Sequence, residues 1–66
     1  MTDEFKLNQT VIIKHDADVD KKLLGELAFV SSRTKNIIHL VMFDRYDENH
    51  RPINVLVYPN EIEPFK

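Results

Sequence analysis

Apolar residues are concentrated in two stretches of the chain, residues 37–43 and residues 53–58, which the polar residues 44–52 separate. Both stretches are rich in β-branched and aromatic residues, which favour strands. A half-buried strand alternates apolar and polar side chains, whereas residues 37–43 are apolar on both faces apart from His39. The pattern predicts a strand with more apolar surface than a short chain can cover, and we interpret this surplus as a sign of binding.

Shorter strands are predicted elsewhere in the chain. Residues 9–14 form a β-branched candidate, and residues 25–30 form a second one that begins at the only glycine. Near the end of the chain, after a proline, residues 60–62 suit a one-turn helix and residues 62–65 a last extended piece. The expected class is therefore all-β, with four to five strands.

A helix is the alternative for residues 20–29. Four apolar residues in this segment recur at helical spacing: Leu23, Leu24, Leu27 and Ala28. Gly25 lies in the middle of the segment, where it costs a helix about 1 kcal/mol relative to alanine. We favour the strand, and the pattern leaves part of the segment open to either structure.

Length and composition limit what the chain can be. With 66 residues, 42% of them hydrophobic and 30% charged, it is expected to fold as a single domain, residues 1–66, of marginal stability. It has no cysteine, so disulfides and thiolate zinc clusters are excluded. Additional stabilisation is expected from a second copy or from a partner protein.

The charge balance narrows the range of partners. The formal net charge is −2, and lysine and arginine are scattered along the sequence, so the basic stripe typical of nucleic-acid binders is not visible. No stretch approaches the ~20 apolar residues that span a bilayer, and the N-terminus is acidic, unlike a signal peptide. We expect a cytoplasmic protein with no membrane partner.

The order of the predicted elements resembles that of the SH3-like small barrels. The segments that carry the resemblance are residues 10–13, 25–30, 39–44, 55–58 and 60–63. This superfamily includes KOW-type modules, the small stromal subunit of photosystem I and the hemimethylated-DNA-binding barrel of enterobacteria. The resemblance implies a small SH3-like barrel with a one-turn helix before the last strand. The lone Gly25 departs from the glycine-rich second strand of KOW-type modules, and Leu56 stands where the plasmid-type dihydrofolate reductase barrel has a catalytic glutamine.

Two assignments compete for the faces of the strand at residues 37–43. Composition directs Ile38, Leu40 and Met42 inward, because His39 lies on the opposite face. The resemblance directs Val41 and Phe43 inward instead, and we favour this second assignment. Ile38, Leu40 and Met42 then become candidate partner-binding residues.

Either assignment leaves apolar side chains that need a cover. Phe5, Leu7 and Phe65 are the internal candidates for covering them. A protein partner or a second copy is the external alternative, because monomers rarely expose large apolar patches.

Two polar segments supply further candidate contacts. Residues 44–52 form a connection longer than a hairpin needs, and its candidate contact residues are Arg45, Tyr46, His50 and Arg51. The acidic segment before residue 21 offers Asp16, Asp18 and Asp20 at a spacing that resembles the start of a calcium loop. Lys21 and Leu27 occupy the positions where that loop needs Gly and Glu, so no metal is expected. For both segments, the alternative is a solvated loop.

No residue set predicts catalysis or a cofactor. Ser31 and Ser32 lack a glycine-rich elbow, and His39 is expected to be a structural histidine. We interpret the chain as a non-enzymatic protein-interaction module, an accessory or inhibitor protein of a phage, plasmid or bacterium. One alternative is a nucleic-acid-associated barrel that uses Arg33, Lys35, Arg45, Tyr46 and Arg51. The others are an enzyme assembled by oligomerisation around a shared pore and a structural subunit of a larger assembly.

Overall fold

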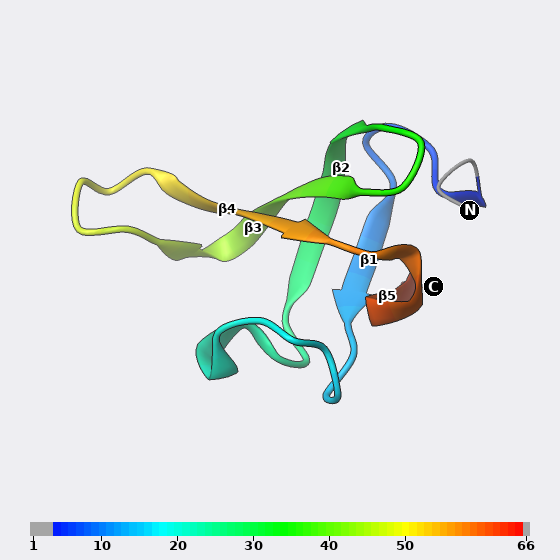
Figure 1. The fold of residues 1–66 in the computed structure, drawn as a ribbon. Helices are drawn as coiled ribbons and strands as arrows, with labels where there is room; N and C mark the ends of the chain where they lie inside the picture. Colours follow the sequence, from blue (N-terminus) through cyan, green and yellow to red (C-terminus); the bar gives the residue numbers. More distant parts are fainter. Residues whose placement is uncertain (1–3, 66) are drawn as a thin grey trace.

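Five antiparallel strands form one sheet in the computed structural model, which describes residues 4–65 (Figure 1). The strands are β1 (Thr10–Ile13), β2 (Leu27–Arg33), β3 (Ile38–Tyr46), β4 (Pro52–Val57) and β5 (Ile62–Pro64). Their order across the sheet is β4-β3-β2-β1-β5. Two 3₁₀ turns lie between strands, η2 (Lys21–Leu23) before β2 and η3 (Pro59–Glu61) before β5.

The predicted all-β class is confirmed, and so is the single helical turn before the last strand. The predicted barrel, closed or half-closed, is not closed, because β4 and β5 remain the two edges of an open sheet. The β3–β4 hairpin runs across the direction of β1 and β2, so the sheet curls (Figure 1). The three residues of β5 pair with β1 alone, so no strand of the described chain joins β4 to the opposite edge.

The helix considered for residues 20–29 is reduced to the 3₁₀ turn η2. Gly25 follows it with a φ of 75°, a conformation that glycine adopts without the steric cost of a side chain. A Cβ at this position would lie 2.7 Å from a ring carbon of His15. β2 then runs through residues 31–33, beyond the predicted end of this strand at residue 30, with a bulge between Val30 and Ser32.

The polar connection between β3 and β4 is shorter than predicted, because Tyr46 pairs with Pro52 and leaves only residues 47–51 as a loop. The Asp47 carboxylate Oδ1 accepts hydrogen bonds from the backbone N–H groups of Asn49 (2.8 Å) and Arg51 (3.0 Å). The loop is therefore closed by its own side chain, and the hairpin projects as an arm from the sheet (Figure 1).

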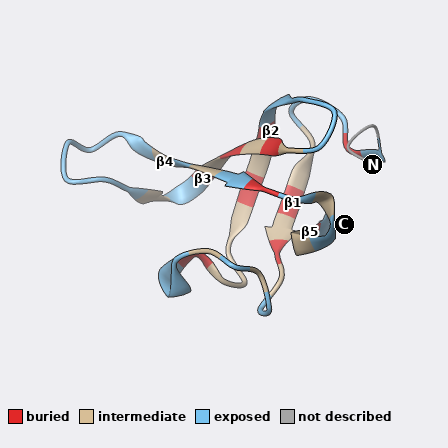
Figure 2. Ribbon diagram, in the orientation of Figure 1, coloured by how far each residue is buried: buried red, intermediate tan, exposed pale blue. Residues whose placement is uncertain are grey.

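The hydrophobic core lies on the concave side of the sheet, where buried positions from several strands meet (Figure 2). It consists of Phe5, Val11, Ile13, Leu23, Ala28, Val30, Ile38, Leu40, Met42, Val57 and Ile62. Figure 2 shows that the projecting hairpin arm contributes none of its tip to this core.

The favoured assignment for the faces of β3 is wrong. Ile38, Leu40 and Met42 point inward and are at most 1% exposed, so they offer no surface to a partner. The physical reason is the polar residue that shares the other face. The His39 ring Nε2 donates to Asn54 Oδ1 (2.8 Å) on the solvent side, where its hydrogen bond is made without burying a polar group.

Candidate functional site

A hollow of about 630 Å³ lies beside β4, and we call it the β4 groove. One side is formed by four consecutive residues of the strand, residues 53–56. The rest is formed by Asp18, Val19, Asp20, Lys22 and Leu23 and by residues 46–48 at the base of the hairpin loop. Successive side chains of a strand point to opposite faces, so a hollow lined by four in a row follows the strand edge rather than one face.

The β4 edge is open to strand pairing. β4 has one strand neighbour, β3, among residues 4–65, and no loop backbone bond in this range reaches residues 53–56. Every second residue of an edge strand directs its N–H and C=O away from its neighbour. The six residues of β4 carry no charge, and prolines stand only at their start, Pro52, and beyond their end, Pro59. The edge therefore has unpaired backbone groups and little that prevents their use.

The floor of the β4 groove is apolar. Leu23 is anchored in the core at 3% exposure, and Val19, Ile53 and Val55 are half-buried and pack against the same core. These side chains come from two segments that lie about thirty residues apart in the sequence. η2 lies below the hairpin in Figure 1, which places its segment on the same side of the molecule as β4. The floor can therefore receive apolar side chains without a rearrangement of the core.

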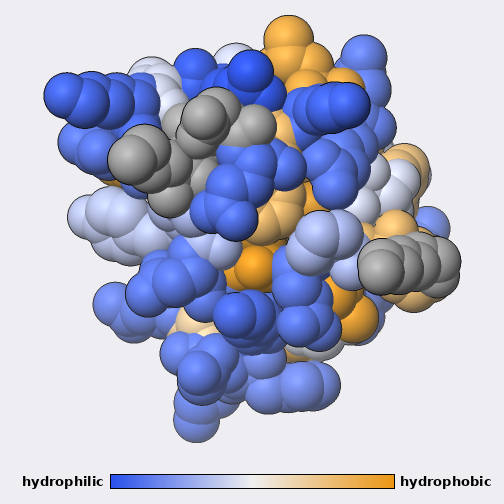
Figure 3. Space-filling model, turned by 90° about the vertical axis from the view of Figure 1, so that its right-hand side faces the viewer, coloured by the Kyte–Doolittle hydropathy of each residue, from blue (hydrophilic) through white to orange (hydrophobic). Residues whose placement is uncertain are grey.

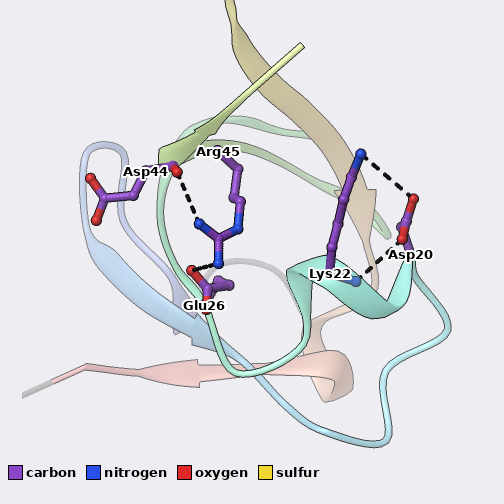
Figure 4. Close-up of polar contacts among 5 residues, drawn as sticks. All are labelled: Asp20, Lys22, Glu26, Asp44 and Arg45. Carbon is purple, nitrogen blue, oxygen red and sulfur yellow. Dashed lines mark hydrogen bonds and ion pairs between the residues drawn. The ribbon is translucent and has the colours of Figure 1, made fainter. Parts of the chain in front are cut away.

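The rim of the β4 groove is acidic. Asp18 and Asp20 contribute carboxylates on the η2 side, and Asp47 and Glu48 contribute them at the hairpin. Among the described residues, Lys22 is the only basic one of the lining, and its Nζ lies 4.0 Å from Asp20 Oδ2 (Figure 4). Four carboxylates and one ammonium group amount to a formal charge of −3 at the groove. The site therefore combines an apolar floor with a negative potential.

Glu61 fixes the position of the η2 segment relative to β4. Its Oε2 accepts a hydrogen bond from the backbone N–H of Asp18 (2.7 Å), and its Oε1 accepts one from Tyr58 (2.8 Å), directly after β4. Asp20 caps η2 by accepting from the backbone N–H of Lys22 (3.2 Å). Both walls of the β4 groove are thus held before any ligand arrives.

The four predicted contact residues of the hairpin lie in three different places. Tyr46 lines the β4 groove, and its hydroxyl donates to the Phe43 carbonyl (3.3 Å). Arg45 is already engaged, because its guanidinium lies 3.2 Å from Glu26 and also donates to the Asp44 carbonyl (Figure 4). The remaining two, His50 and Arg51, stay at the exposed tip outside the groove.

The acidic segment contributes two of its three predicted residues. Asp18 and Asp20 line the β4 groove, whereas Asp16 is exposed outside it. Between residues 4 and 65, no group of three or more potential metal ligands lies together. Sequence reasoning missed the apolar floor and the acids at positions 47 and 48. The uncharged run of β4 between two prolines was the signal that could have indicated an open edge.

An apolar surface remains on the convex face of the sheet. Phe29 and Phe43 lie there with ring centroids 5.4 Å apart, Val41 is half-buried, and Phe43 is 41% exposed. Of the three residues expected to cover such a surface, Phe5 packs into the core, and the other two are exposed. On the side opposite to the hairpin tip, hydrophobic side chains form patches separated by hydrophilic ones (Figure 3). On the convex face, the rings of Phe29 and Phe43 therefore partly cover each other.

The basic residues do not form one surface. Arg33 and Lys35 lie at the β2–β3 turn, whereas Arg45 and Arg51 lie at the other end of β3. The nine residues of β3 separate these ends by about 25 Å, at roughly 3.3 Å per residue. Arg33 also donates to the Phe5 carbonyl. The set proposed for nucleic-acid contact is therefore divided between opposite ends of the sheet.

A second hollow, of about 680 Å³, lies beside β5. Its lining is mixed in charge, with Glu4 and Glu63 opposed by Lys14, and it includes two prolines.

The described part of the chain contains no helix with the length and hydrophobicity needed to cross a bilayer. The chain matches no family model, no curated protein and no solved structure.

Proposed function

We propose that this chain is a non-enzymatic protein-interaction module whose β4 groove takes up an extended segment of a partner protein as an additional strand. The observation that carries the proposal is the run of four consecutive, uncharged β4 residues along one side of the groove, on a strand that among residues 4–65 has β3 as its one strand neighbour. In strand addition, main-chain hydrogen bonds supply affinity, and pockets for alternate side chains supply specificity.

Preorganisation supports this proposal. Leu23 anchors the far wall in the core, and Glu61 hydrogen-bonds both to that wall and to the exit of β4. A binding site that is already ordered loses less conformational entropy when its ligand binds. Two apolar floor residues of β4, Ile53 and Val55, alternate along the strand, as alternate ligand side chains would.

A nucleic-acid function has less support. The basic residues are divided between the two ends of β3, and the groove carries a formal charge of −3 that repels phosphate. Binding to duplex DNA or RNA that weakens steeply with salt would favour this alternative. We expect no such binding at 50 mM salt.

The proposed strand addition is tested with peptides selected against the full chain from a random ten-residue display library. The best binder is resynthesised with a single N-methyl group at each position in turn. Methylation removes a backbone donor, so strand addition predicts a strict alternation along the peptide between large and negligible losses of affinity. Amide hydrogen exchange at alternate positions of residues 53–56 should also slow when the peptide is bound.

Two results would refute strand addition. One is an affinity that does not depend on which alternate positions are methylated. The other is slowed exchange at β5 with none at β4. The residues of β5 serve as the internal control because they form the opposite edge of the same sheet.

A further inference from the structure

We infer that the segment received by the β4 groove is basic, with lysine or arginine side chains alternating with apolar ones; this inference rests on the strand addition proposed above. The partner chemistry follows from the arrangement of the floor and the rim. The floor is apolar, and the rim carries four carboxylates against one ammonium group. A complementary ligand must therefore present apolar surface and positive charge from the same short segment.

Lysine and arginine meet both requirements in one side chain. Their aliphatic stems pack along apolar surface while the charged head reaches towards solvent. A stem lying on Val19 and Val55 would place its head at the acidic rim. A segment of about six residues matches the length of β4.

Two rim carboxylates are available for a new ion pair. In the described part of the chain, no hydrogen bond or ion pair engages the carboxylate of Asp18 or Glu48. Asp47, in contrast, uses its carboxylate to close the hairpin loop, and Asp20 caps η2. Asp18 and Glu48 come from different sides of the groove, so a bound segment can meet a free negative charge on both.

The same charges disfavour a second copy of this chain as the occupant. Pairing β4 with β4 of another copy would bring two acidic rims together, each with a formal charge of −3. Apposed like charges oppose association and select against the wrong partner. The acidic rim therefore leaves the edge open to a basic segment while it discourages self-pairing.

The test uses three capped six-residue peptides that differ only in charge: alternating valine and lysine, valine and glutamine, and valine and glutamate. Binding to the full chain is measured by isothermal titration at 50 mM and 500 mM salt. We expect the lysine peptide to bind at least tenfold more tightly than the glutamine peptide at low salt, and the glutamate peptide not to bind. The preference should shrink at high salt, because exposed charges are screened.

The double variant Asp18→Asn/Glu48→Gln should remove most of the lysine preference. Both residues are exposed, and their carboxylates make no hydrogen bond within residues 4–65, so circular dichroism should show an unchanged fold. The matched control is Asp16→Asn/Glu63→Gln, which changes the net charge equally outside the β4 groove. This control should retain the tenfold preference.

The outcomes separate this inference from the function on which it rests. If lysine and glutamine peptides bind equally and with the alternating methylation pattern, the basic preference is wrong and strand addition stands. If the lysine peptide fails to bind, or binds equally to the groove variant and to the control, the basic preference is also wrong. If no peptide shows the alternating pattern, both proposals fail.

Discussion

The two edges of the sheet, β4 and β5, differ in how readily each can pair with a further strand. β5 has three residues, including Glu63 and Pro64, and proline lacks the N–H that a neighbouring strand would need. β4 has six residues without a charge, and it borders a groove along four of them. Short length, charge and proline are devices that protect an edge, and this sheet applies all three to β5. The comparison supports the proposal that the open edge at β4 takes up a further strand.

The protection of β4 lies beside the strand rather than within it. Its neighbouring acids, Asp18, Asp20, Asp47 and Glu48, come from two other segments. A charge within the strand would block every partner, whereas charges at the rim oppose only ligands of the same sign. The β4 edge can therefore select a partner segment by its charge, while the β5 edge is protected against pairing with any further strand.

The largest loss of stability is expected from Met42→Lys, which would unfold the sheet and so remove both of its edges. Met42 is 1% exposed and pairs with Ala28 across the sheet, so the substitution buries an ammonium group in the core. A loss of more than ~4 kcal/mol should unfold a domain of this size. Circular dichroism and thermal unfolding measure it.

The matched control for Met42→Lys is Phe43→Lys, at the next position of β3 on the convex face. Phe43 is 41% exposed and lies outside the core, so this variant should stay folded and lose about 1 kcal/mol, mostly from its ring contact with Phe29. A folded Met42→Lys protein that changes only its oligomeric state would contradict the inward direction of Met42.

Glu61→Ala should loosen the β4 groove while leaving β5 paired. The variant removes the acceptor for the backbone N–H groups of Asp18 and Tyr58, so we expect a loss of ~1–2 kcal/mol in the free energy of unfolding. Urea titration measures the loss, and amide exchange at Asp18 should accelerate. Glu63→Ala is the control, and equal destabilisation by both variants would count against a special role for Glu61.

Val55→Lys should convert the β4 edge into one as protected as β5. The inserted charge lies on the apolar floor of the groove, so the affinity of a selected peptide should fall at least tenfold. Val55 is half-buried, and the cost in stability should be about 1 kcal/mol. Leu7→Lys, at a position that is 56% exposed and outside the groove, is the control for added charge. Unchanged binding to the Val55 variant would place the peptide elsewhere.

The smallest change in stability and peptide binding is expected from a substitution in β5. Glu63→Val removes the charge from β5 but leaves its short length and Pro64, so β5 should remain closed to peptides. Stability should change by less than ~0.5 kcal/mol, because Glu63 is exposed. Peptide titration with amide exchange measures the result. Protection gained at β5 would show that a single charge is what distinguishes the two edges.

Parts of this structure were accessible from sequence. The alternation around His39 predicted Ile38, Leu40 and Met42 as core residues, and the resemblance to SH3-like barrels led away from that correct assignment. The order of the strands predicted a barrel, closed or half-closed, but closure depends on whether two distant edges meet. The 3₁₀ turn at η2 was ambiguous, because its apolar spacing suits a helix, while Gly25 ends one.

The amino-acid sequence alone determined the all-β class, the approximate strands and the helical turn before β5, because these follow from local alternation and proline positions. It also identified Asp18, Asp20 and Tyr46 as contact candidates. Only the tertiary structure decided that they share one groove, since η2 and β4 are brought together by core packing and by the hydrogen bonds of Glu61. Contacts between segments some thirty residues apart leave no periodic pattern along a chain, so the open edge at β4 became visible only in the folded protein.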